Sequence, residues 1–413
     1  MALLQAREGH DAIRRKVVAA VGSPPDDETP EAVRRWAEGA AAGLAPSGRR
    51  LGACPSWREH GGIECIAAAP PEPVIRPAPI WIGAPDPRFP APAQRGAGTP
   101  ATTAGLSILR IRDGSVAQFG RFGVLVGTAD TPLVSDLSCP EAALAELMDW
   151  DLGKLRSTSY RHLGSALYLT DRFWSANYAH WMLDALARLC LAGDREEGLV
   201  VATTPIRARW QIDLLTAAGV REQDVLEIGE YEGFVARDLL VADDVGGRVA
   251  HPAARAHPRL VGAIRRRCGA PLLPKRGGPV VLVSRRNSGS RLIEDEATFV
   301  EQLRACGVVA EVVELEEHTP AEQWRIFGEA RAIVAVHGAA LANTVVMRPG
   351  ATLVEILPPA YAIPGFWLVA GAVGVRHVGV TAVEEAADER LPRRRNIRVP
   401  ARTAEAIADI LTE

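Results

Sequence analysis

The sequence contains no apolar run of the roughly 18 or more residues that a membrane-spanning helix needs. Its first residues, MALLQAREGHDAIRRK, become charged before the apolar core of a signal peptide could form. From these two absences we expect a cytoplasmic protein with no transmembrane segment.

Paired cysteines and a strong net charge are also missing. The six cysteines are scattered without any CxxC spacing, so the sequence supports neither a zinc knuckle nor a redox dithiol. The formal net charge is −3, whereas nucleic-acid binders carry large basic patches. We therefore expect no nucleic-acid partner.

The chain is long enough for two hydrophobic cores. Its 413 residues, 47% of them hydrophobic and 23% charged, exceed the roughly 100–200 residues of one ordinary domain. Ten prolines between Pro70 and Pro100 forbid a helix there and favour extended chain. We predict an N-terminal arm with an irregular, proline-rich segment over residues 1–105.

A strand and helix rhythm begins after this arm. The stretch LSILRIRDGSVAQFGRFGVLVGTAD, which starts at Leu106, alternates apolar and polar residues around Asp113-Gly114, and this predicts strands joined by a hairpin. Strand and helix patterns then follow each other, as in parallel sheets whose strands are joined by helices. We predict an N-terminal α/β domain over residues 106–270.

The second half repeats this rhythm more clearly. Near-continuous apolar strands such as PVVLVSRR and RAIVAVHG suit a parallel sheet that is covered on both faces. Thr319 followed by Pro320 predicts the start of a helix. These patterns predict a doubly wound α/β domain over residues 271–390, with a strand and an amphipathic helix over residues 391–413 that pack back on it.

Ligands of open α/β sheets bind beyond the carboxyl ends of the strands. The strand PVVLV is followed by Arg285 and Arg286, then by a Ser/Gly loop and Arg291. The arginine fork matches phosphate oxygens, and such a loop lets backbone N–H groups approach them. Eleven arginines or lysines and no acidic residue lie between Asp244 and Glu294. Such a basic stretch would attract a multiply charged anion such as a nucleotide diphosphate, and a solvated basic surface is the competing interpretation.

Two further strand ends carry polar residues. His337 and Gly338 end the strand RAIVAV, and a helix from Ala339 would direct its free N–H groups at a phosphate. A structural histidine is the competing interpretation. Glu355 interrupts the buried strand ATLVEIL, where a carboxylate needs a specific partner. Sugar or ribose hydroxyls, or an arginine, would satisfy it.

The segment NYAHWMLDALARL, residues 177–189, combines a buried helix with a polar stripe. At about 100° per residue, His180, Asp184 and Arg188 lie on one side and apolar residues occupy the rest. One interpretation is a structural pair between His180 and Asp184. The other is a general base that takes a proton from an attacking hydroxyl.

Three stretches, taken in this order, resemble glycosyltransferase family 61. They are NYAHWMLDALARL, SRRNSGSRLIEDE and VHGAALANTVVMRPGATLVEILP. The family includes bacterial capsular-polysaccharide-type transferases and eukaryotic xylosyl- and N-acetylglucosaminyltransferases. It often has Asn where this sequence has Asp295, and nothing in residues 1–105 resembles it.

The resemblance implies a GT-B-like α/β fold, in which two Rossmann-type domains face each other across a cleft. It implies an inverting enzyme that moves a sugar from a nucleotide-sugar to a hydroxyl acceptor, such as a glycan, a polysaccharide or a small-molecule glycoside. It implies no cofactor and no metal. The base would be Asp184 or His180, with Asp184 preferred. The implied donor-binding residues are Arg285, Arg291, His337, Gly338, Ala339, Asn343 and Glu355.

Two other functions stay open at this point. A catalytically silent protein that binds sugar-nucleotides or assists assembly would keep the donor residues, although the presence of both His180 and Asp184 argues mildly against it. A nicotinamide-dependent oxidoreductase would also use Rossmann-type domains, but no GxGxxG follows a strand. A homo-oligomer is compatible with the sequence.

Overall fold

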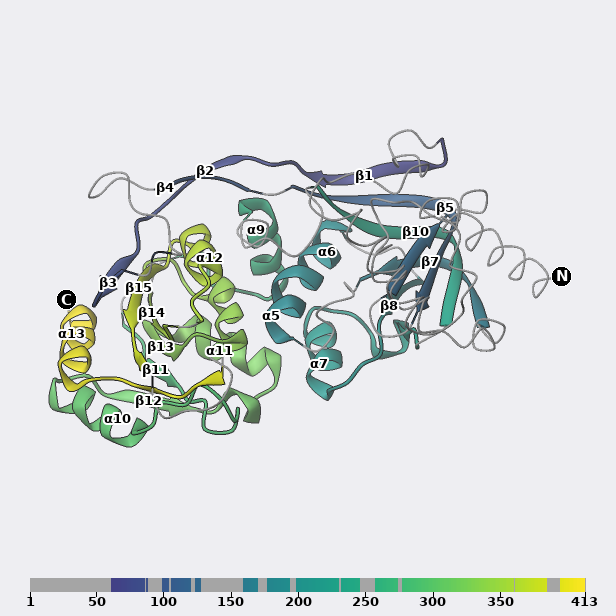
Figure 1. Cartoon of the computed structure of the whole chain (residues 1–413). Helices are drawn as coiled ribbons and strands as arrows, with labels where there is room; N and C mark the ends of the chain where they lie inside the picture. Colours follow the sequence, from purple (N-terminus) through teal and green to yellow (C-terminus); the bar gives the residue numbers. More distant parts are fainter. Residues whose placement is uncertain are drawn as a thin grey trace, which may run out of the picture.

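The structure is a computed structural model, and it describes residues 61–85, 87, 99–103, 105–119, 123–127, 159–169, 177–193, 198–229, 232–245, 257–273, 277–359, 361–384 and 394–412. Two large sheets lie side by side, and helices α5 (Tyr178–His180), α6 (Leu186–Leu191) and α9 (Pro258–Arg267) lie between them (Figure 1). The predicted α/β class with parallel strands is confirmed.

The first sheet mixes antiparallel and parallel strands. In spatial order it contains β1 (Ile63–Ala69), β5 (Gly105–Phe119), β10 (Glu232–Val245), β7 (Ser159–Tyr168), β8 (Leu199–Thr203) and β9 (Val225–Glu227), with β6 (Gly123–Gly127) beside β5. β1, β5 and β10 pair antiparallel in turn, whereas β10, β7, β8 and β9 are parallel. Helix α7 (Arg209–Ala217) and the short helix η3 (Glu222–Asp224) connect β8 to β9.

The antiparallel strands predicted in this stretch are confirmed, because β5 pairs with β6, but the turn predicted at Asp113-Gly114 is wrong. β5 continues through both residues, and its pairing with β10 extends from Gly105 to Ala117. Asp113 has a left-handed φ of 47°, and a Cβ on Gly114 would overlap Leu239. These two residue types therefore serve a local irregularity inside one long strand rather than a chain reversal.

The second sheet is fully parallel. In spatial order it contains β12 (Ala310–Val313), β11 (Val280–Val283), β13 (Ala332–Val336), β14 (Thr352–Leu357), β15 (Arg376–Thr381) and β3 (Ile80–Ile82). In chain order, β11 to β15 are arranged 2-1-3-4-5, so the strand order reverses between β11 and β13. Doubly wound sheets bind ligands beyond the carboxyl ends of their strands at such a switch point.

Helices surround this second sheet. They are α10 (Glu296–Ala305), η4 (Leu315–Glu317), α11 (Pro320–Glu329), η5 (Ala339–Val346), α12 (Gly365–Val373) and α13 (Ala401–Thr412), and a short ladder joins β16 (Val383–Glu384) to β17 (Ile397–Arg398). The helix start predicted at Thr319 is confirmed, because its backbone N–H donates to Glu322 at 2.8 Å in a capping box. α13 packs against α10 through residues such as Ile407 and Leu411.

Residues 61–85 run along both sheets (Figure 1). β1 pairs with β5, β2 (Pro73–Arg76) forms a ribbon with β4 (Thr99–Thr102), and β3 extends the second sheet. Trp81 of β3 lies so close to Gly379 that a Cβ there would overlap its ring. This part of the predicted arm therefore supplies a strand to each sheet.

Helix α9 fastens the two halves together. Arg265 donates to the carbonyl oxygens of Val345 and Met347, at 2.8 and 2.6 Å, where η5 ends. Arg267 donates at 2.7 Å to the carbonyl oxygen of Ala218, which follows α7 in the first half. Cations satisfy the free carbonyl groups at the carboxyl ends of helices. One helix therefore caps an element in each half.

Two kinds of feature do not occur in the described ranges. No helix there is long and apolar enough to cross a membrane. No group of three or more His, Cys, Asp or Glu side chains there could hold a metal ion.

Candidate functional site

The switch point of the second sheet brings Arg285 against the turn of His337 and Gly338. Arg285 follows β11, and its Nε donates to the carbonyl oxygen of Ser290 at 3.1 Å. Its Nη1 lies so close to Gly338 that a Cβ there would overlap it. The close approach of the guanidinium, and not backbone strain, favours glycine here, since the φ of 179° is ordinary extended chain.

Arg291 reaches the same turn from the far end of the loop. Its Nη1 donates to the carbonyl oxygen of His337 at 2.6 Å, and its guanidinium lies 5.1 Å from the centre of the Tyr361 ring. Arg291 has a left-handed φ of 55°, which is uncommon for a residue with a Cβ. Two arginines predicted to bind the donor therefore converge on one turn.

These two guanidinium groups make no salt bridge to a carboxylate within the described ranges. Burial, and then the charge of Arg291, lower the pKa of Arg285 to about 10. Burial also lowers the pKa of Arg291. A buried charge is costly unless an opposite charge or hydrogen bonds compensate it. The turn is therefore a place where a bound anion would be stabilised.

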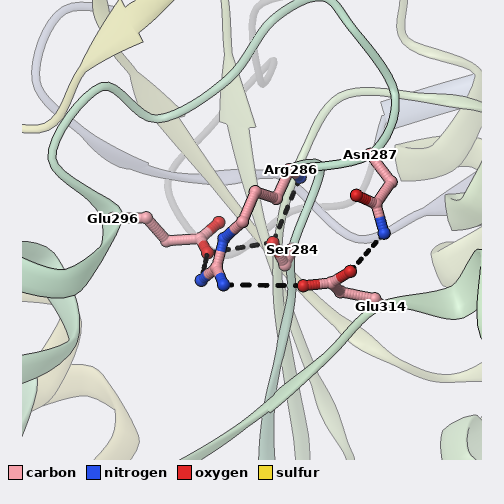
Figure 2. A network of polar contacts seen from close by, with 5 residues as sticks. All are labelled: Ser284, Arg286, Asn287, Glu296 and Glu314. Atoms are coloured by element: carbon pink, nitrogen blue, oxygen red, sulfur yellow. Dashed lines mark hydrogen bonds and ion pairs between the residues drawn. The ribbon is translucent and has the colours of Figure 1, made fainter.

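Arg286 points into a different network from its neighbour. Figure 2 shows its guanidinium between two carboxylates, with Nη2 3.0 Å from Oε1 of Glu296 and Nη1 3.6 Å from Oε1 of Glu314. Ser284 donates to the same Glu296 oxygen at 2.9 Å, and Asn287 donates to Glu314. These contacts tie the start of the arginine loop to α10 and to the end of β12, and they satisfy Arg286 inside the protein.

A buried carboxylate lies behind His337. Glu355 is 0% exposed, and its Oε1 lies 2.5 Å from Nδ1 of His337 while its Oε2 lies 2.7 Å from Nε2 of His377. Burial would raise the pKa of Glu355, but hydrogen bonds to the two histidines and their charges outweigh it and lower the pKa. The partners are thus histidines, not an arginine. Its contact with a ribose stays a prediction, and it would require a histidine to give way.

η5 begins directly after Gly338. Its first hydrogen bond runs from the N–H of Leu341 to the carbonyl oxygen of Gly338 at 3.0 Å. The N–H groups of Ala339 and Ala340, both half-buried, therefore lie ahead of the first bond of the helix, as expected at an amino end.

Asn343 lies deeper in η5 and is fully buried. Its Oδ1 accepts a hydrogen bond from the hydroxyl of Tyr178 at 2.8 Å, and its Nδ2 donates to Gln323 at 3.0 Å. Both ends of the amide are therefore used inside the protein. This geometry gives Asn343 a part in the contact between the two halves and offers no support for its predicted contact with the donor.

The helix around His180 changes its winding. Tyr178–His180 is α-helical, and Asn177 caps its start by accepting from the N–H of Ala179 at 2.9 Å. η2 (Trp181–Ala185) is a π-helix, which ends where the N–H of Leu186 bonds to the carbonyl oxygen of Trp181. Single π-turns inside α-helices are frequent at functional sites.

His180 and Asp184 form the pair that the sequence predicts. Nδ1 of His180 lies 2.7 Å from Oδ2 of Asp184, and the side chains are 12% and 14% exposed. Because an ionised carboxylate only accepts hydrogen bonds, Nδ1 carries the hydrogen. Arg188, the next member of the stripe, is buried and donates to the carbonyl oxygen of Leu169 at 3.3 Å. Arg188 thus serves the structure of the helix.

The helix with this pair rests on η5 of the other half. α5 and η2 both pack against η5. Tyr178 and Trp181 also meet Trp210 edge to face, with ring centres 5.4 and 6.0 Å apart. The His180–Asp184 pair is therefore held by the same element whose amino end follows Gly338.

Three residues in these contacts are missing from the sequence predictions. His377 carries the signal that identified Glu355, because it is a polar residue inside the apolar strand RHVGV. Tyr178 lies inside the helical segment of residues 177–189, where its position is typical of the apolar face. Tyr361 follows β14 in a proline-rich loop that has no periodic pattern to mark it.

Residues 178–354 match the family model described as Glycosyltransferase 61. The matched segment contains the His180–Asp184 pair, the arginine loop and the His337–Gly338 turn, and it ends one residue before Glu355. A comparison with curated proteins gave no match. The match agrees with the resemblance seen in the sequence: residues 178–354 are similar to glycosyltransferase family 61, and this indicates a glycosyltransferase enzyme.

Proposed function

We propose that the enzyme inverts the anomeric centre while it transfers a sugar from a nucleotide-sugar to a hydroxyl acceptor, without a metal ion. The acceptor would be a glycan, a polysaccharide or a small-molecule glycoside. One observation carries the proposal. Arg285 and Arg291, both largely buried, converge on the His337–Gly338 turn at the switch point, and neither forms a salt bridge to a carboxylate in the described ranges. A diphosphate would supply the missing negative charge.

Negative charge develops on the diphosphate as its bond to the anomeric carbon breaks. Guanidinium groups that are already in place stabilise this charge without further reorganisation. The N–H of Ala339, at the amino end of η5, adds a partial positive charge. In this proposal these groups take the part that a divalent cation has in metal-dependent transfer.

The acceptor hydroxyl attacks the anomeric carbon from the side opposite the diphosphate. Its oxygen forms the new glycosidic bond, and its proton passes to the His180–Asp184 pair. The electrons of the broken bond leave with the diphosphate, so a single displacement inverts the configuration. The pair is supported for this role by its partial exposure and by the packing of its helix on η5.

The geometry favours His180, rather than Asp184, as the general base that takes the proton. The family resemblance favours Asp184 as the base, but Oδ2 of Asp184 lies 2.7 Å from Nδ1 of His180 and accepts its hydrogen. In Ser-His-Asp sites this arrangement directs Nε2 of the imidazole to the reacting hydroxyl and leaves the carboxylate to orient the ring. We therefore assign the proton to Nε2 of His180 and the orientation of the ring to Asp184.

A thermal-shift screen tests the donor half of the proposal. UDP-, GDP- and CDP-sugars, their bare diphosphates and NAD are added to the full chain in EDTA, because ligands that bind the native state raise its Tm. We expect one nucleotide class to raise Tm in EDTA. No shift with any nucleotide would contradict the donor site, and a shift that needs Mg²⁺ or Mn²⁺ would contradict metal independence.

Product analysis tests the transfer half. The nucleotide-sugar that gives the largest shift is incubated with a panel of alkyl glycosides, and the anomeric configuration of the product is read by NMR. We expect a configuration opposite to that of the donor. A product that keeps the configuration of the donor would exclude a single displacement.

A further inference from the structure

His377 joins the site from outside the matched family segment. It is buried in β15, and its Nε2 lies 2.7 Å from Oε2 of Glu355, whose Oε1 lies 2.5 Å from Nδ1 of His337. Glu355 and His377 both follow the last matched residue, 354. His337 follows β13, Glu355 lies in β14 and His377 lies in β15, so these three side chains form one row that leads from the switch point into the sheet.

The carboxylate fixes the hydrogens of both imidazole rings. An ionised carboxylate accepts hydrogen bonds and donates none, and the two histidines favour this form because they lower the pKa of Glu355 against the effect of burial. Nδ1 of His337 and Nε2 of His377 therefore carry hydrogens. In the neutral form of the ring with its hydrogen on Nδ1, the lone pair of His337 lies on Nε2, for which the described residues provide no hydrogen-bond partner.

Apolar groups surround this row. The rings of Tyr361 and Phe366 each have their centre 5.3 Å from that of His337. Glu355 pairs in register with Gly379, and the ring of Trp81 covers Gly379 too closely for a Cβ. In such surroundings hydrogen bonds are strengthened. Nε2 of His337 is thus an acceptor that a ligand donor would satisfy.

We propose that Glu355 and His377 are positioning residues that hold His337 with its hydrogen on Nδ1, so that Nε2 accepts a hydrogen bond from a hydroxyl of the nucleotide-sugar. That hydroxyl belongs to the ribose or to the transferred sugar. The inference rests on the proposed function. In it His337, and not Glu355, binds the hydroxyl of the nucleotide-sugar. Arg285 and Arg291 keep the diphosphate.

The tautomer of His337 is measured first, without any ligand. Long-range ¹H–¹⁵N NMR spectra of the ¹⁵N-labelled full chain are recorded at pH 8, and His337→Gln identifies the resonances of His337. We expect a hydrogen on Nδ1 and none on Nε2. A hydrogen on Nε2 overturns the inference, whether or not any nucleotide binds. This measurement therefore separates a failure of the inference from a failure of the proposed function.

Hydroxyl discrimination tests the positioning role of His377. UDP, GDP and CDP are compared with their 2′-deoxy forms, and UDP-glucose and GDP-mannose with their 2-deoxy-sugar forms. The proteins are wild type, His377→Gln, which keeps an N–H for Glu355, and His377→Phe, which does not. We expect wild type and His377→Gln to prefer a hydroxylated ligand about tenfold, which corresponds to one hydrogen bond. His377→Phe is expected to lose this preference.

The ligand pair that loses its preference identifies the hydroxyl as that of the ribose or that of the sugar. A merely structural role of His377 would lower stability but leave the ratio of the two affinities unchanged. His162→Phe, at an exposed histidine, is the matched control. An equal preference in His377→Phe and in wild type overturns the inference.

Discussion

Tyr178 and Asn343 are 165 residues apart in the chain, yet the tyrosine hydroxyl donates a 2.8 Å hydrogen bond to Oδ1 of Asn343. This bond joins the helix that carries His180 to the middle of η5. Arg265 holds the carboxyl end of η5 through two carbonyl oxygens. The spacing between the His180–Asp184 pair and the arginine turn therefore depends on these buried contacts.

Removing the hydroxyl of Tyr178 should destabilise the fold. Tyr178→Phe leaves Oδ1 of the buried Asn343 without its donor, which costs about 1–3 kcal/mol. Urea denaturation monitored by circular dichroism measures the change in the free energy of unfolding. Asp213→Asn, which breaks an exposed pair with Arg209, is the control and should change it by less than about 1 kcal/mol. Equal effects of the two substitutions would show that the hydroxyl bond is not stabilising.

Tyr178 should also make the free energy of unfolding fall as the pH rises above about 10. Burial raises the pKa of Tyr178 above its ordinary value, so above about pH 10 the unfolded chain loses this proton while the folded chain keeps it. The contribution is complete below the unfolded pKa and is lost as pH rises toward the folded pKa. The slope is up to about 1.4 kcal/mol per pH unit. Tyr178→Phe should flatten the fall measured by urea denaturation between pH 10 and 11.

Strand ends could be predicted from the sequence because they depend on local patterns. The apolar runs before Arg285 and His337 have lengths and compositions typical of parallel strands, and both residues follow strands that flank the switch point. The capping box at Thr319 is likewise local. These predictions used periodicity and caps within about ten residues, and the structure supports the elements they define.

Non-local pairing explains what could not be predicted. β3 has only three residues, between prolines, and no periodicity announces that Trp81 would cover Gly379. The partners of Glu355 come from residues 337 and 377, so only the sheet order reveals that they are histidines. The turn was wrongly predicted at Asp113-Gly114 for the same reason. The long partner strand β10 pairs with β5 on both sides of these residues, so β5 continues through them.

Variants of the proton-accepting pair should lower turnover without weakening donor binding. His180→Gln should reduce kcat by about 10²–10⁴, the usual contribution of a general base. Asp184→Asn should cause a similar loss, because an amide can donate to Nδ1 and favour the wrong tautomer. Initial rates at saturating donor measure kcat, and the Tm shift with donor confirms binding. If Asp184→Asn were inactive while His180→Gln kept most of its turnover, Asp184 would be the base.

Neighbouring arginines should behave differently. Arg285→Gln removes a charge-assisted contact to the proposed diphosphate, worth about 1.5–3 kcal/mol or roughly 10- to 150-fold in affinity. Arg286→Gln removes exposed pairs to Glu296 and Glu314, so its effect on affinity should stay below about tenfold. Calorimetric titration with the bare diphosphate compares them. The salt dependence of binding should weaken only in Arg285→Gln, and equal losses would place the anion elsewhere.

Two glycine substitutions should separate binding from stability. A Cβ at Gly338 meets the end of the flexible Arg285 side chain, which can move away, whereas a Cβ at Gly379 meets the packed ring of Trp81. Gly338→Ala should therefore leave Tm nearly unchanged and lower donor affinity about as much as Arg285→Gln. Gly379→Ala should lower the free energy of unfolding by about 1–3 kcal/mol, as overpacking does. Gly164→Ala, with open space around it, is the control. Unchanged affinity in Gly338→Ala would mean that the position of Arg285 beside the turn is not needed for binding.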